Sequence, residues 1–283
     1  MNGILAIYKE KGYTSRDVVN IISKELGTKK VGHTGTLDPL ATGVLVLCIG
    51  QGLKLVELLT NHDKEYIAKI KLGIETDTLD ITGNVLKQEN IKNYTKKEVE
   101  VILKNFVGKI NQEVPKYSAI KVNGKKLYEY ARNNIEVDLP TREVEIFDLK
   151  LISDVKNNEF YIKCHVSKGT YIRSLVRDIG KELGTCATMT ELERTKLGDF
   201  ELENTYTLDD INSGLYQLSR IEDVLKLPKI TVDKDLEKKI RNGQVLKRFF
   251  AEDMAMIINK DNKLIAIYQS KNDTQVKPYR MFI

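Results

Sequence analysis

One stretch near the N-terminus limits the folds open to this chain more than any other. Residues 31–43 read VGHTGTLDPLATG and place three glycines around a single carboxylate, Asp38, which directly precedes a proline. Glycine allows backbone conformations that other residues avoid, and the residue before a proline is driven out of the helical region. Residues 44–49 then form a continuous apolar run of strand length. The pattern predicts a stiff, irregular loop that carries Asp38 and is attached to a buried strand.

This loop has two interpretations. A charged side chain on a rigid loop fixed to the core is a candidate catalytic group. An Asp-Pro pair is also an ordinary turn signal, and the local chemistry by itself favours the turn. Evidence from the rest of the chain has to decide between them.

Composition sets the broad class of the protein. Of the 283 residues, 41% are apolar and 30% charged, as in a soluble globular protein with a large core. The N-terminal residues meet charge too early for a secretory signal, and no apolar run approaches the length of a membrane span. The three cysteines, Cys48, Cys164 and Cys186, are widely spaced, which fits a reducing cytoplasm better than a disulfide frame. We therefore expect a cytoplasmic protein.

Residues 115–132 carry the clearest nucleic-acid signal. They contain five basic residues, one acid and three interleaved tyrosines. Cations attract phosphates and flat rings stack on unpaired bases, so Lys121, Lys125 and Lys126 are candidate RNA contacts. A solvated charged face on a hairpin and helix is the plainer interpretation, and composition alone slightly favours it. The net charge of +5 is too small to decide.

A predicted strand over residues 64–72 presents a second candidate. Apolar and polar side chains alternate along it, and Tyr66 falls on the apolar side. A buried tyrosine still needs a partner for its hydroxyl. The edge of a pocket therefore suits Tyr66 better than the middle of a core.

A third candidate for a functional site lies at a predicted junction between a strand and a helix. Alternation predicts a strand over residues 160–166, and apolar spacing predicts a helix from residue 172 that ends at Gly184. Tyr171 lies where the strand gives way to the helix, and Arg173 lies off the apolar face of the helix. Arg173 is thus either a surface cation or a group that enters a cleft.

The sequence lacks the motifs that mark several classes of enzyme. The sequence has no Walker A loop, no Gly-x-Gly-x-x-Gly and no nucleophile elbow. The three histidines, His33, His62 and His165, share no metal-ligand spacing with cysteine or with one another. We expect neither a cofactor nor a metal.

The sequence pattern changes around residues 226–228, which indicates a domain boundary. Beyond this point a hairpin is predicted from residues 255–258 and 264–268. We therefore expect a main domain over residues 1–226 and a small second domain over residues 227–283.

Several short sequence motifs resemble those of the TruB family of tRNA pseudouridine synthases, and they occur in the family's order along the chain. They cover nearly the whole chain: Lys9, Gly12, Thr14 and Ser15, the loop 33–45, Lys64 with Tyr66, and the segments 72–83, 117–132 and 168–173 and the region of Leu192. Members of this family convert uridine 55 in the T-arm of tRNA to pseudouridine. The resemblance implies an α+β fold, with a mixed β-sheet core, flanking helices and a small, mostly β, PUA-like RNA-binding domain at the C-terminus.

The same resemblance implies roles for individual residues. Asp38 would be the catalytic aspartate, Tyr66 would stack on the target base, and Arg173 would pair with the aspartate. The other residues that line the pocket would be His33, Tyr171 and Leu192. The reaction yields an isomer, so no cofactor is implied. The expected partner is the T-arm of tRNA, and the chain is expected to be a monomer without an obligate protein partner.

Two positions depart from the family pattern. Glu10 stands where the family usually has a proline after Lys9, and this departure concerns only a turn. Glu193 stands where an arginine is usual, which removes a cation near the rim of the pocket and weakens the assignment of Leu192.

Three other interpretations compete with a tRNA-modifying isomerase. A non-catalytic RNA-binding protein would use the same basic and aromatic surface, with Asp38 shaping a turn. A hydrolase would use Asp38 together with His33. Guide-RNA-dependent pseudouridine synthases share the Asp38 loop, so the position of the substrate uridine rests on the resemblance alone.

Overall fold

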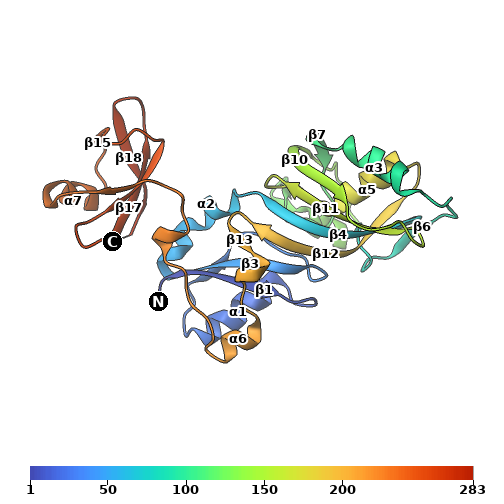
Figure 1. Ribbon diagram of the computed structural model, residues 1–283, viewed down its shortest axis with the longest axis horizontal. Helices are drawn as coiled ribbons and strands as arrows, with labels where there is room; N and C mark the ends of the chain where they lie inside the picture. Colours follow the sequence, from blue (N-terminus) through green and yellow to red (C-terminus); the bar gives the residue numbers. More distant parts are fainter. Residues whose placement is uncertain (283) are drawn as a thin grey trace.

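Two β-sheets organise residues 1–282, which are the part of the chain that the computed structural model describes (Figure 1). The larger sheet is mixed and has nine strands in the order β1-β3-β12-β4-β11-β10-β7, with β2 paired to β3 and β13 paired to β12. Its members are β1 (Gly3–Lys9), β2 (Val31–His33), β3 (Thr42–Ile49), β4 (Lys64–Leu72), β7 (Gly108–Glu113), β10 (Thr141–Leu151), β11 (Glu159–Val166), β12 (Ala187–Leu197) and β13 (Phe200–Glu201). All neighbouring strands are antiparallel except β3 and β12, which run parallel.

Three amphipathic helices cover one face of this sheet: α1 (Ser15–Glu25), α3 (Lys96–Lys104) and α5 (Ile172–Glu182). The first two begin with capping boxes, in which a threonine and an acid three residues later bond to each other's backbone N–H. The shorter helices are α2 (Val56–Thr60), α4 (Leu127–Arg132), α6 (Leu208–Asn212) and α7 (Lys234–Arg241), with 3-10 turns η1 (Gly50–Leu55), η2 (Leu202–Asn204) and η3 (Ile221–Asp223). Two small hairpins leave the sheet, β5 (Ile74–Thr76) with β6 (Val85–Gln88) and β8 (Lys121–Val122) with β9 (Lys125–Lys126).

The apolar run that follows the Asp38 loop is β3, and it is buried on both faces. Leu45, Leu47 and Ile49 join the cluster beneath α1. The alternate residues, including Val44 and Val46, join a second cluster on the other face. A strand covered on both sides needs apolar residues at every position, which explains why the run is continuous and does not alternate.

The second sheet lies at one end of the elongated molecule (Figure 1). Its order is β14-β16-β17-β18-β15, with bounds β14 (Lys229–Thr231), β15 (Leu246–Lys247), β16 (Met254–Ile258), β17 (Leu264–Ser270) and β18 (Gln275–Met281). The hairpin expected from the sequence is β16 and β17. With α7 this sheet forms a small, mostly β C-terminal domain with its own apolar core, so the molecule has the α+β architecture expected.

The C-terminal domain is joined to the larger sheet by apolar and polar contacts. Met256 and Ile267 are fully buried in the cluster that covers the second face of β3. Arg280 Nε donates to Lys54 O at 3.1 Å, and the Arg280 guanidinium pairs with Glu57. The two domains therefore share a core instead of being linked only by a flexible segment.

No helix within residues 1–282 has both the length and the apolar character that crossing a membrane requires. The three cysteines, expected to stay reduced, are free thiols.

We predict that Met256→Ala destabilises the protein by about 2–5 kcal/mol, because it removes buried volume from the core that the two domains share. Urea denaturation of the full chain measures this free energy. The matched control is Leu215→Ala, because this leucine is 66% exposed and its truncation is expected to cost less than about 0.5 kcal/mol. Equal effects of the two substitutions would contradict a shared core.

Candidate active site

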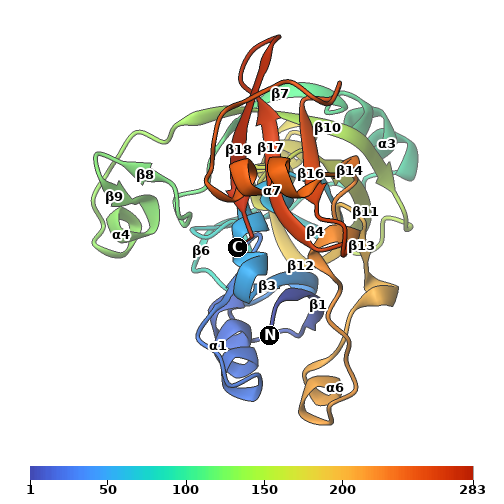
Figure 2. The same ribbon diagram turned by 90° about the vertical axis from the view of Figure 1, so that its left-hand side faces the viewer.

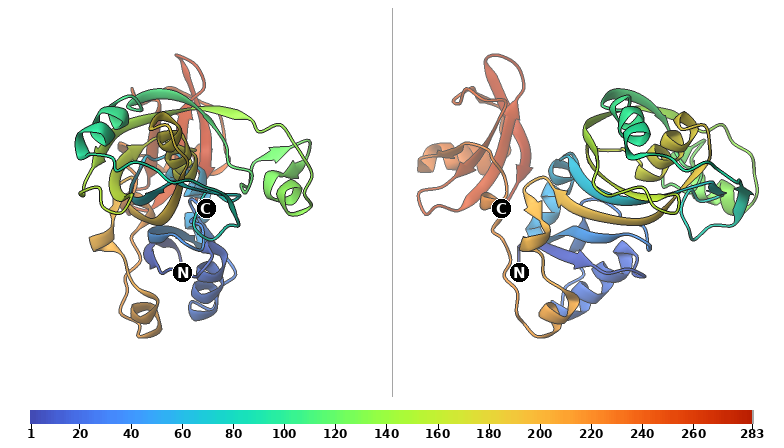
Figure 3. Two further views of the ribbon diagram at one scale, coloured as in Figure 1. Left: turned by 90° about the vertical axis from the view of Figure 1, so that its right-hand side faces the viewer. Right: turned by 45° about the vertical axis from the view of Figure 1, so that its right-hand side comes forward.

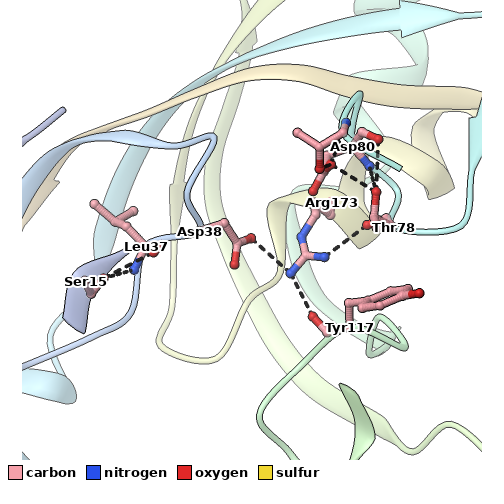
Figure 4. Close-up of polar contacts among 8 residues, drawn as sticks. Ser15, Leu37, Asp38, Thr78, Asp80, Tyr117 and Arg173 are labelled. Atoms are coloured by element: carbon pink, nitrogen blue, oxygen red, sulfur yellow. Dashed lines mark hydrogen bonds and ion pairs between the residues drawn. The ribbon is translucent and has the colours of Figure 1, made fainter. Parts of the chain in front are cut away.

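The loop between β2 and β3 carries Asp38 and is tied to the domain on both sides of this residue. Ser15, the first residue of α1, makes two hydrogen bonds with Leu37: its Oγ accepts from Leu37 N at 2.8 Å and donates to Leu37 O at 3.2 Å. On the other side, Pro39 O accepts from Gly12 N at 2.8 Å. The loop is therefore stiff, as expected, and the Asp38 carboxylate projects from it (Figure 4).

Asp38 faces Arg173 across the site (Figure 4). Arg173 Nη2 lies 3.0 Å from Asp38 Oδ2, and the side chains are 7% and 37% exposed respectively. The same guanidinium donates to two carbonyls, Thr78 O from Nη1 and Tyr117 O from Nη2, both at 3.0 Å. Arg173 is thus buried beside Asp38 and is not a surface cation. Its fixed guanidinium orients one oxygen of Asp38, while the carboxylate remains open to a ligand.

Tyr66 and Leu192 lie on the neighbouring strands β4 and β12, and both are 8% exposed. Both belong to the apolar cluster on the helix-covered face of the sheet. Tyr66 is paired with Arg194 in the register of β4 and β12, two residues along from Leu192. The structure therefore brings a tyrosine and a leucine that are far apart in sequence to one part of the sheet.

His33 ends β2, five residues before Asp38. Its Nδ1 accepts a hydrogen bond from Gly35 N at 3.3 Å. Burial lowers the pKa of His33, and the positive charges of Arg16 and Arg194 lower it further. A ring that accepts at Nδ1 and resists protonation is a neutral imidazole with its proton on Nε2.

Tyr171 is the residue directly before α5, as the strand-to-helix junction predicted. Its backbone is held by Gln112, whose Oε1 accepts from Tyr171 N at 2.8 Å and whose Nε2 donates to Tyr171 O at 3.1 Å. Burial raises the pKa of the Tyr171 hydroxyl, so this group stays protonated at neutral pH. Gln112 had no recognisable signal in the sequence, because its partner lies 59 residues away.

The three candidate lysines make none of the contacts described above for Asp38 and Arg173. Residues 116–132, which we call the basic arm, contain the β8–β9 hairpin and α4 and project from the body of the molecule (Figures 2 and 3). Lys121 and Lys125 are exposed, and Lys126 Nζ lies 5.4 Å from the centre of the Tyr128 ring. None of the three is in an ion pair with another described residue.

The turn after β5 adds residues to the site that the sequence placed only in a structural turn. Asp80 is 5% exposed, and its Oδ1 accepts from Thr82 N and from the hydroxyl of Thr78, both at 3.0 Å. These bonds fix the segment whose Thr78 carbonyl receives Arg173. Among residues 1–282 no three His, Cys, Asp or Glu side chains are grouped closely enough to hold a metal ion.

The fold of the whole chain is similar to folds already solved. Two solved structures match nearly the whole chain. "Structure of H/ACA RNP bound to a substrate RNA containing 2'-deoxyuridine" has a TM-score of 0.73 at 22% identity and covers 99% of this chain and 85% of the solved chain. "Crystal Structure of a Cbf5-Nop10-Gar1 Complex" has a TM-score of 0.72 at 24% identity and covers 98% and 83%. At this identity the likeness concerns the fold.

Sequence comparison then gives the family. Residues 23–172 match "TruB family pseudouridylate synthase (N terminal domain)", and residues 173–230 match "tRNA pseudouridylate synthase B C-terminal domain". The chain therefore belongs to the TruB family of pseudouridylate synthases. A relative from Oceanobacillus iheyensis, named tRNA pseudouridine synthase B, is 45% identical and covers 100% of this chain and 98% of the relative. Another of the same name from Caldanaerobacter subterraneus subsp. tengcongensis is 39% identical, with coverage of 100% and 99%.

We predict that replacing Lys121, Lys125 and Lys126 together by glutamine weakens RNA binding and flattens its salt dependence. Each phosphate contact contributes about 0.7–0.9 to the slope of log K against log salt concentration, so the slope falls by about 2 to 3. Titration of T-arm RNA at several salt concentrations measures it.

The matched control replaces Lys96, Lys97 and Lys104 on α3, which are exposed and lie on the opposite side of the molecule from the arm (Figure 2). This variant loses the same charge and is expected to keep the slope of the unmodified protein. An unchanged slope in the arm variant would show that the arm does not contact phosphates.

Proposed function

We propose that the protein is a tRNA pseudouridine synthase that isomerises uridine 55 in the T-arm of tRNA. The observation that carries the proposal is the Asp38–Arg173 pair, 3.0 Å apart at the meeting point of three loops. The names of full-length relatives that are 39–45% identical support the choice of substrate.

Pseudouridine formation requires few catalytic groups from the protein. The N1–C1′ glycosidic bond breaks, the detached uracil turns, and a C5–C1′ bond forms, after which the proton on C5 is lost and N1 gains one. The product has the same atoms and oxidation state as the substrate, so the balance needs no second substrate. Asp38 supplies the carboxylate that acts as nucleophile or base in the first step.

The uridine must leave the RNA stack before Asp38 can reach it. Flipping a base costs a few kcal/mol, and stacking on an aromatic ring returns about 1–3 kcal/mol. Tyr66 is the proposed stacking partner, and Leu192 the apolar group beside it. The neutral ring of His33 and the protonated hydroxyl of Tyr171 provide further surface for an uncharged base.

Arg173 is proposed to hold the carboxylate of Asp38 in a fixed orientation. Its two bonds to the carbonyls of Thr78 and Tyr117 hold the guanidinium in place whether or not Asp38 is engaged with RNA. A preorganised cation of this kind costs no rearrangement during the reaction. We also propose that Tyr66 helps to remove the proton that leaves C5.

We further propose that residues 1–226 form the catalytic domain and that residues 227–283 form a PUA-like domain that adds RNA contacts. The basic residues Lys238, Lys239 and Arg241 at the end of α7 favour this role. The protein is proposed to act in the cytoplasm as a monomer without an obligate protein partner.

We predict that Asp38→Asn lowers the rate of tritium release from C5-labelled uridine in T-arm RNA by more than about 10³-fold, in the range for loss of a nucleophile. Asparagine keeps the shape and removes the charge, so RNA affinity is expected to stay largely unchanged. Release by the variant at a rate comparable to the unsubstituted protein would exclude a catalytic Asp38, whereas RNA binding without release by either protein would leave an RNA-binding protein.

The mass of the product separates isomerisation from hydrolysis by Asp38 and His33. Isomerisation leaves the mass of the RNA unchanged, whereas loss of uracil lowers it and adds water at C1′. Mass spectrometry of the same reaction mixture makes this comparison without any further variant.

We predict that the purified chain alone, without any guide RNA, modifies position 55 of an unmodified tRNA transcript. The family relationship favours direct recognition of the T-arm, and mapping pseudouridines before and after incubation shows the position. In tRNA from cells that lack the protein, pseudouridine at position 55 is expected to be absent. Modification that appears only when a guide RNA is added would contradict the proposal.

A further inference from the structure

Arg194 on β12 is a buried cation for which the reaction scheme above has no use. It is 1% exposed and is the largest fully buried side chain among the described residues. Its Nε donates to Val44 O at 2.7 Å and its Nη2 donates to Gly35 O at 3.2 Å. No carboxylate within residues 1–282 forms an ion pair with it.

The two carbonyls lie on either side of Asp38: Gly35 is in the loop, and Val44 is in β3, the strand that the loop enters. We call these two segments the limbs of the loop. Gly35 precedes Asp38 by three residues and Val44 follows it by six. One planar guanidinium therefore ties the start of the loop to its end, and its fork of donors is rigid. The nitrogens that bind the two carbonyls are different, so the spacing between the limbs is set by the guanidinium itself.

Gly43, near the start of β3, makes room for the backbone of Arg194. Arg194 is paired with Gly43 in the parallel register of β12 and β3. Gly43 has φ of +101°, and a Cβ there would lie 2.3 Å from Arg194 O. A Cβ on Gly35 would lie 3.6 Å from Arg194 Nη1, in ordinary contact. The conformation of Gly43 is therefore matched to the close approach of the Arg194 backbone.

Burying a cation among carbonyls has an electrostatic cost. Lys9 illustrates this cost, because its pKa is lowered to about 8. Burial is the main cause; the charge of Asp38 opposes the shift, and the charge of Arg194 adds to it. An apolar side chain of similar length would fill the same space without this cost. Groups that are costly to bury are retained mostly where they serve function or specificity.

We infer that Arg194 is a positioning residue for pseudouridine formation: by bonding both limbs of the loop, it holds Asp38 at the place where the flipped uridine arrives. This inference rests on the proposed catalytic role of Asp38. A displacement of about 1 Å at a reacting group costs on the order of 10²-fold in rate, so a loosened loop lowers the rate of chemistry more than it lowers the affinity for RNA.

The test compares Arg194→Met, which keeps length and removes every donor, with Arg194→Lys, which keeps the charge and one donor nitrogen. Three quantities are measured for each: the single-turnover rate at saturating T-arm RNA, the RNA dissociation constant, and the free energy of unfolding. Arg194→Met is expected to lower the rate by about 10²-fold while the dissociation constant stays within about twofold. Arg194→Lys is expected to recover part of the rate.

Lys64→Met is the matched control. Lys64 is also a buried cation that donates to two carbonyls, Thr60 O and His62 O, but these belong to the turn before β4. This variant is expected to lose stability and to keep its single-turnover rate within about twofold. A loss of rate in Lys64→Met equal to that in Arg194→Met at equal loss of stability would show that Arg194 acts only as a core residue.

Other outcomes also decide. Arg194→Met with the rate of the unsubstituted protein overturns the inference. If Arg194→Met does not fold, Arg194→Lys becomes the deciding variant, and an unchanged rate in it overturns the inference. An inactive unsubstituted protein, or an active Asp38→Asn variant, would instead overturn the proposed function, so the two failures are distinguishable.

Discussion

The burial of β3 on both faces is the constraint on which the rest of the molecule depends. One face packs beneath α1 and the other is covered by η1, α2 and the C-terminal sheet. A strand enclosed in this way cannot change register without exposing half of its apolar side chains. The Asp38 loop begins at one of its neighbours and ends at the strand itself, so the position of the carboxylate is set by the core and not by the loop alone.

Local periodicity was sufficient to predict much of the fold and part of the site. The buried strand, the alternation that turns Tyr66 inward, the junction at Tyr171 and the helix that follows it each depend on residues that are close in sequence. Arg194 was not found, because its signal is a charged residue in a strand and its partners are 150 and 159 residues away. Arg173 was ambiguous for the same reason: only the order of the strands directs the start of α5 towards Asp38.

Cations in this protein do two physically different kinds of work. Those on the basic arm are exposed, except for the half-buried Lys126, and have no carboxylate partners among the described residues, so they remain available to phosphates and are screened by salt. Those near Asp38, namely Arg173 and Arg194, are buried and bonded to carbonyls, so they act through fixed geometry. Under the proposed function, the first group serves RNA capture and the second orients Asp38. The net charge of the protein reveals neither group of cations, since it adds them to the charges of surface ion pairs.

Arg173 Nη2 is shared between Asp38 and the carbonyl of Tyr117. Tyr117 lies near the root of the basic arm, and the next residue, Ser118, accepts from Tyr128 N at the start of α4 through its carbonyl. The main chain of the arm therefore supplies one of the groups that hold the partner of Asp38. Under the proposed function, the segment that captures the RNA and the group that aligns the acid share this one connection.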